Sequence, residues 1–150
     1  MRKNHFINRN ISILYRYGQK FISLKLKSLI PELEVGQIPF LIQVYRHPGI
    51  TQDQISANAV MDKGTCARNI KQLESSGFII REINEKDRRV NHIYPSSKAL
   101  DLKEKIFDIL NDLHKVLYDG FSSQEINSTI KILDSMTENI ASYLNKLKYS

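Results

Sequence analysis

The chain has 150 residues, of which 41% are hydrophobic and 25% charged, a composition that excludes a fibrous or disordered protein and fits one domain, residues 1–150. No apolar run approaches the ~18 residues of a membrane span, and no signal-peptide pattern follows the charged start, so we expect a cytoplasmic protein without a membrane partner. The formal net charge of +6 favours a nucleic-acid partner only weakly, because residues 1–31 hold 7 Lys or Arg and no acidic residue, while the rest is nearly balanced.

The N-terminal part of the chain is predicted to be helical. Apolar residues recur close to helical spacing through residues 5–29, which predicts a long amphipathic helix that ends before Pro31. A second helix is predicted for residues 36–47, because Pro39 is tolerated in a first turn and Pro48 and Gly49 follow as a stop signal.

Two short helices are predicted next, each with its own start signal. Thr51 and Gln54 form a Thr-x-x-Gln capping box, which predicts a helix over residues 52–58. Asp62 is a good N-cap for a helix over residues 63–75. The two helices follow each other after a tight turn.

A β-hairpin and two long helices are predicted to complete the chain. The β-branched runs 78–83 and 90–94 predict two strands, and the charged segment 84–89 between them predicts a polar tip. Serine caps then introduce two amphipathic helices, over about residues 96–118 and 122–148.

This order of elements predicts a mostly α fold with a small β-hairpin, namely a winged helix-turn-helix lobe at about residues 36–95. Long helices at about 5–30 and 96–148 flank it and are predicted to be dimerisation helices. A helix of about 25 residues spans nearly 40 Å, which is more than a small lobe can cover. A partner subunit is therefore expected to bury part of these helices.

The predicted helix over residues 63–75 has a narrow apolar stripe and a polar face that suits DNA. Arg and Lys can pair with guanine edges or phosphate, Asn and Gln can pair bidentately with adenine, and Thr can reach either. The alternative is an ordinary solvated helix face. The candidate DNA-reading residues are Lys63, Thr65, Arg68, Asn69, Lys71 and Gln72.

The hairpin supplies a second set of candidates. Arg88 and Arg89 are natural ligands for a groove or a phosphate, and Asp87 can orient one of them by a charge-assisted hydrogen bond. The tip could instead be only a soluble turn in which Asp87 and Arg89 form an internal ion pair. Asn91 completes the wing candidates, and the candidate helix-turn-helix supports are Thr51, Gln52 and Asp62.

Several of these segments resemble successive motifs of the MarR family of transcriptional regulators. The resemblance covers about residues 37–100, and it is carried most specifically by the start of the 63–75 helix together with the hairpin. The segments are Gln37-x-Pro39-Phe40-Leu41, Thr51-Gln52-x-x-Ile55-Ser56, Met61-Asp62-Lys63-Gly64-Thr65-x-Ala67-Arg68, Lys71-x-Leu73-Glu74-x-x-Gly77-Phe78-Ile79 and Asp87-Arg88-Arg89-Val90-Asn91.

The resemblance implies a homodimer whose terminal helices intertwine and place two reading heads on a pseudo-palindromic site in double-stranded DNA. It also implies regulation of transcription, usually repression, that is often released by a small-molecule effector bound between the dimer helices and the DNA-binding lobe. Which residues hold such a ligand stays unknown. Four aromatic residues could line the cleft, although aromatic residues on long helices are usually dimer core: Tyr15, Tyr17, His114 and Tyr118.

No cofactor, metal site or catalytic residue is predicted. The histidines are scattered and none has zinc-ligand spacing from Cys66 or another histidine. Cys66 itself is interpreted as a small buried hydrophobe rather than a sensor thiol. No nucleophile elbow, Gly-rich phosphate loop or pair of catalytic carboxylates is present, so the chain is not predicted to be an enzyme.

Two other functions remain as alternatives to DNA binding. A winged-helix module can bind protein without binding DNA, and apolar anchors on the exposed face of the 63–75 helix would favour that function. RNA binding would need exposed stacking aromatics, and the hairpin offers only Phe78 and Tyr94 near its base. Duplex DNA is therefore the preferred partner.

Overall fold

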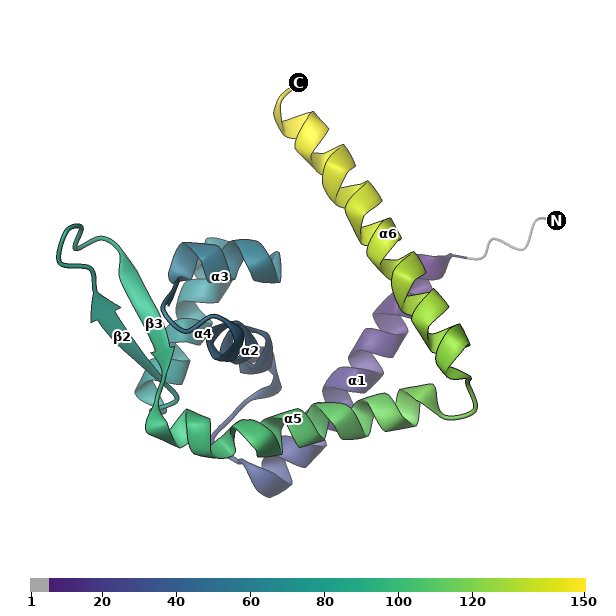
Figure 1. Cartoon of the computed structure of the whole chain (residues 1–150), viewed down its shortest axis with the longest axis horizontal. Coiled ribbons are helices and arrows are strands. Elements are labelled where there is room, and N and C mark those ends of the chain that lie inside the picture. The colour runs from purple at the N-terminus through teal and green to yellow at the C-terminus, as the bar shows by residue number, and fades with distance from the viewer. Residues whose placement is uncertain (1–5) are drawn as a thin grey trace. The chain divides into compact units, whose positions relative to one another are not determined.

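The computed structural model describes residues 6–150, and it confirms a mostly helical fold with a small antiparallel sheet and long terminal helices (Figure 1). The elements in chain order are α1 (Ile7–Leu29), the 3-10 turn η1 (Val35–Gln37), α2 (Ile38–Arg46), β1 (Ile50–Thr51), α3 (Gln52–Ala59), α4 (Lys63–Ser75), β2 (Ile79–Ile83), β3 (Asn91–Pro95), α5 (Ser97–Tyr118) and α6 (Ser123–Lys148).

The chain divides into two compact units between Leu113 and His114. The first unit holds α1 to α4, the sheet and most of α5, and the second holds the end of α5 and all of α6. All elements of the predicted winged helix-turn-helix therefore belong to the first unit.

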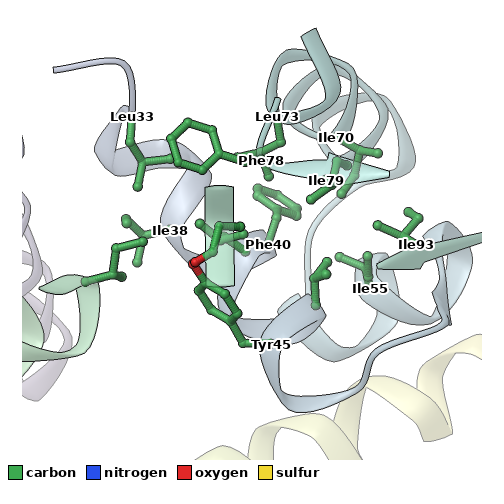
Figure 2. Close-up of a cluster of buried hydrophobic side chains, with 14 of the residues drawn as sticks. Leu33, Ile38, Phe40, Tyr45, Ile55, Ile70, Leu73, Phe78, Ile79 and Ile93 are labelled. Atoms are coloured by element: carbon green, nitrogen blue, oxygen red, sulfur yellow. The ribbon is translucent and has the colours of Figure 1, made fainter. Parts of the chain in front are cut away.

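The core of the first unit lies where α2, α3, α4 and the sheet meet (Figure 2). Five large side chains from these elements are each 0% exposed: Phe40 of α2, Ile55 of α3, Leu73 of α4, Phe78 just before β2, and Ile93 of β3. Burying a side chain of this size stabilises the fold by about 1.5–3 kcal/mol. These contacts fix the three helices and the sheet relative to one another.

Local capping signals set the helix starts, as the sequence predicts. The Thr51 hydroxyl accepts a hydrogen bond from the Gln54 amide (3.2 Å), and the Gln54 side chain accepts one from the Thr51 amide (3.0 Å). Asp62 caps α4, and a further capping box at Ser122 begins α6. The predicted helix over residues 36–47 also forms, but its first turn is the 3-10 turn η1, with Pro39 in the first turn of α2.

The sheet differs from the prediction because it has three strands, in the order β1-β3-β2, rather than a hairpin alone. Strand β1 is only Ile50–Thr51, and it pairs antiparallel with Ile93 and His92 of β3. Two residues are too few for the alternation of apolar and polar side chains that marks a strand in a sequence. This strand ties the start of α3 to the predicted wing.

The second unit, taken by itself, leaves an apolar stripe of α6 exposed. No residue of α6 is buried, although its apolar residues recur every three or four positions and share one helix face. The stripe comprises Ile130, Leu133, Met136, Ile140, Leu144 and Leu147. A helix face of this kind needs a partner surface to remove it from water.

The turn between α3 and α4 contains a strained residue. Val60 has a φ of 53° in the left-handed region and is 89% exposed. A β-branched residue in this conformation costs roughly 1–2 kcal/mol, and at this exposure Val60 gains little from packing.

Replacing Val60 should therefore stabilise the protein. We expect Val60→Asn to raise the free energy of unfolding by about 1 kcal/mol, because Asn tolerates the left-handed region. Urea denaturation at fixed protein concentration measures this change. Val60→Ala is the matched control, because it also removes the exposed valine but keeps an unfavourable residue in the left-handed region. Equal stabilities of the two variants would contradict the strain argument.

Candidate nucleic-acid interface

The start of α4 is fixed by Asp62. Its carboxylate accepts hydrogen bonds from the Thr65 amide (2.8 Å) and from the Thr65 hydroxyl (2.7 Å). These two hydrogen bonds lower the pKa of the Asp62 carboxyl below its usual value. Asp62 is therefore charged at neutral pH, where it also complements the positive end of the helix dipole.

The core determines which face of α4 points outward. Cys66, Ile70 and Leu73 are each 0% exposed and lock one side of the helix against the lobe. At 100° per residue, the opposite side carries Arg68, Lys71 and Gln72, all of which are exposed. We call these three residues the reading face.

The cations of the reading face have no partner in the part of the chain that the structure describes. Neither the Arg68 side chain nor the Lys71 side chain makes a hydrogen bond or an ion pair there. Lys63, at the first turn, forms only a 3.8 Å ion pair with Asp53, in which both side chains are more than 80% exposed. Exposed pairs of this kind contribute little energy. These positive charges are available to a negatively charged ligand.

Two of the six α4 candidates are already engaged within the helix. The Thr65 hydroxyl donates to Asp62, and the Asn69 side-chain amide donates to the Thr65 carbonyl (2.9 Å). Both residues are only partly exposed. Because of these hydrogen bonds and their partial burial, Thr65 and Asn69 are less available to a ligand than Arg68 and Lys71.

The tip of the hairpin is organised by Asn84 and Asp87. The Asn84 side-chain oxygen accepts from the Lys86 amide (2.9 Å), and the Asp87 carboxylate accepts from the amide of Arg89 (3.0 Å) and from its guanidinium (3.2 Å). Asp87 therefore orients Arg89 by an ion pair inside the hairpin, which was one of the predicted alternatives. Arg88 is exposed and has no partner among residues 6–150.

The remaining candidates gather between α3 and the hairpin. Thr51 and Gln52 at the start of α3 border a surface hollow together with Arg89 and Asn91 of the hairpin. Asn91 is the first residue of β3, opposite Ile83, and is only partly exposed. The structure thus brings two of the support residues, Thr51 and Gln52, to the same hollow as the wing residues Arg89 and Asn91, whereas Asp62, Asp87 and Arg88 do not line it.

Arg81 is a structural residue of this region that sequence reasoning missed. Its guanidinium donates to Glu74 of α4 and to the Gln52 side chain of α3 (3.2 Å), so it joins both helices to β2. The sequence did contain a sign that Arg81 points toward the lobe. Side chains alternate along a strand, so Arg81 lies on the same face of β2 as Ile79 and Ile83. Gln37 was also missed as an interacting residue: it is buried, and its side chain bonds to Glu34 and Gln72.

Cys66 is buried in the helix-turn-helix. Desolvation raises the pKa of its thiol, and the charges of Asp53 and Asp62 raise it further. A buried thiol with a raised pKa is unreactive, which supports the interpretation as a small buried hydrophobe. Within residues 6–150 no group of three His, Cys, Asp or Glu side chains is placed to hold a metal ion, and no helix there is long and apolar enough to cross a membrane.

Comparison with known proteins gives concordant matches to one family. A family model described as "MarR family" matches residues 33–90. A MarR transcriptional regulator from Methanosarcina mazei Go1 is 34% identical, with a TM-score of 0.84, over 93% of this chain and 99% of that one. The uncharacterised HTH-type transcriptional regulator YybA of Bacillus subtilis is 28% identical over 89% of this chain and 88% of its own length.

One solved relative was crystallised with DNA. It is a putative MarR family transcriptional regulator from Listeria monocytogenes complexed with a 26mer DNA, 27% identical with a TM-score of 0.83, over 95% of this chain and 93% of that one. The matches are to transcriptional regulators, which confirms the prediction that the chain is a regulator and not an enzyme. The chain therefore belongs to the MarR family and is a DNA-binding transcriptional regulator with a winged helix-turn-helix.

Proposed function

We propose that the protein is a homodimeric repressor in which each subunit inserts the reading face of α4 into the major groove of one half of a pseudo-palindromic operator. The observation that carries this proposal is the pair of unpartnered cations, Arg68 and Lys71, on a helix that is capped at Asp62 and packed on its other side. A rigid helix with free donors suits direct readout of bases and phosphates.

The hairpin acts as the wing in this proposal. Arg88 contacts a phosphate or the adjacent minor groove, while Asp87 holds Arg89 in a defined orientation beside it. Lys63, in the first turn of α4, contacts a phosphate of the DNA backbone. Thr51, Gln52 and Asp62 support the reading helix, whereas Thr65, Asn69 and Asn91 lie at the border of the interface.

The same surface argues against a winged helix that binds only protein. Such an interface needs apolar anchors, and every exposed residue of α4 except Gly64 is charged or polar. The exposed residues of the helix are Lys63, Gly64, Arg68, Lys71, Gln72, Glu74 and Ser75.

The uncovered stripe of α6 supports the homodimer. A second copy of the chain brings an identical apolar stripe, and two such faces bury each other. A dimer also doubles the reading heads and sets their spacing at about one helical turn of DNA, roughly 34–36 Å. A small ligand that favours a different spacing of the two heads would release the operator, which is how we propose that repression ends. The protein acts where its operator is, in the cytoplasm.

DNA binding is tested by fluorescence anisotropy with randomised duplex DNA at two salt concentrations, followed by selection of the bound sequences. We expect salt-dependent binding and a selected palindrome with half-sites about one turn apart. Arg88→Ala should weaken binding to all sequences and reduce the salt slope by about 2, because the dimer loses one phosphate contact in each half-site. Lys146→Ala in α6 is the matched control and should leave the slope unchanged. Absence of binding at low salt would instead favour the protein-binding winged helix.

The dimer is tested by light scattering coupled to size-exclusion chromatography. We expect the wild type to show twice the chain mass of 17.4 kDa at micromolar concentration. Ile140→Glu should shift the protein to the monomer, because it places a charge in the apolar stripe. Ser142→Glu, on the opposite side of α6, is the matched control and should remain dimeric. A monomeric wild type would contradict the proposal.

A further inference from the structure

A hydrogen-bond relay runs from the segment before α2 to the reading face. Gln37 is buried, at 3% exposure, and its side-chain oxygen accepts from the Glu34 amide (3.0 Å). Its side-chain nitrogen Nε2 donates to the side-chain oxygen Oε1 of Gln72 (3.4 Å). The Glu34 side chain closes the relay by accepting from the Gln37 backbone in a capping box.

The donors and acceptors in this relay determine how the two side-chain amides are oriented. A backbone N–H can only donate, so it must face the oxygen of the Gln37 amide. The NH₂ group of Gln37 can only donate as well, so it must face the oxygen of the Gln72 amide. Gln72 therefore uses its oxygen inward, and its NH₂ group is left on the exposed side of α4.

This orientation changes what Gln72 can read. Bidentate recognition of adenine needs both the oxygen and the nitrogen of the amide to face the base edge. With its oxygen turned toward Gln37, Gln72 offers only a donor, and guanine is the base that presents two acceptors, O6 and N7, in the major groove. We propose that Gln37 is a positioning residue that holds Gln72 as a hydrogen-bond donor, so that the protein reads guanine rather than adenine opposite Gln72.

The neighbouring side chains agree with a reading face that only donates. Arg68 and Lys71 have donors and no acceptor. The Asn69 amide is engaged with the Thr65 carbonyl, and its oxygen lies on the Gly36 side of α4, 4.0 Å from where a Gly36 Cβ would stand. No outward group of α4 is thus arranged for the paired donor and acceptor of adenine. The inference rests on the proposed insertion of α4 into the major groove.

The test compares the sequences that three proteins select from randomised duplex DNA: the wild type, Gln72→Ala and Gln37→Met. Gln72→Ala should lose the preference at one base pair in each half-site, and the wild type should prefer guanine over adenine there by at least about fivefold, the lower end for one base contact. Gln37→Met keeps the volume of the buried side chain but cannot bond to Gln72. It should reduce the guanine preference at that base pair to near parity.

Gln37→Glu provides a variant that reverses the relay. A carboxylate at this position can only accept, so it turns the Gln72 NH₂ group inward and its oxygen outward. We expect the preferred base to change from guanine to one that donates in the major groove, adenine or cytosine. Thermal melting confirms that each variant is folded before its selected sequences are compared.

The outcomes separate this inference from the proposed function. If the wild type selects no sequence at all, the insertion of α4 is wrong and the inference falls with it. If the wild type selects an operator but Gln72→Ala changes no position, or if the Gln72-dependent position prefers adenine, only the inference is wrong. The same holds if the folded variants Gln37→Met and Gln37→Glu both keep the wild-type preference for guanine.

Discussion

Cys66, Ile70 and Leu73 pack into the lobe core, and their burial fixes the rotation of α4 about its own axis. The availability of Arg68 and Lys71 follows from this one constraint, because residues on the opposite side of a packed helix cannot turn away from solvent. The Asp62 cap fixes the first turn of the helix, and Arg81 joins α3 and α4 to β2. A surface fixed in rotation and position can distinguish bases that differ only in where a donor or acceptor stands.

The hairpin has a different construction from α4. Its base is held by the five-residue register of β2 with β3 and by the added strand β1. Its tip is held by short-range hydrogen bonds to Asn84 and Asp87. Arg88 carries charge outward, and Arg89 remains beside Asp87.

The sequence predicts much of this fold because its signals are local. The Thr51 and Asp62 caps, the apolar stripe of α4 and the β-branched runs each lie within a few residues, so periodicity and capping rules suffice. The features that were missed depend on tertiary contacts. Strand β1 is recognisable only through its pairing with β3, and the bonds from Gln37 to Gln72 and from Arg81 to Gln52 join residues 35 and 29 positions apart. For the same reason residue type alone does not reveal the orientation of the Gln72 side chain, which bonds to the distant buried side chain of Gln37.

The most direct test of the account is amide hydrogen–deuterium exchange with and without the selected operator duplex. The account predicts that DNA slows exchange in two separate segments, residues 63–75 and 84–90, because the first lies in the major groove and the second follows the backbone. Exchange in α6 should stay the same, since its proposed partner is the second subunit. Slowing confined to α6, or no slowing in α4 while DNA is bound, would contradict the central claim that the reading face of α4 contacts DNA.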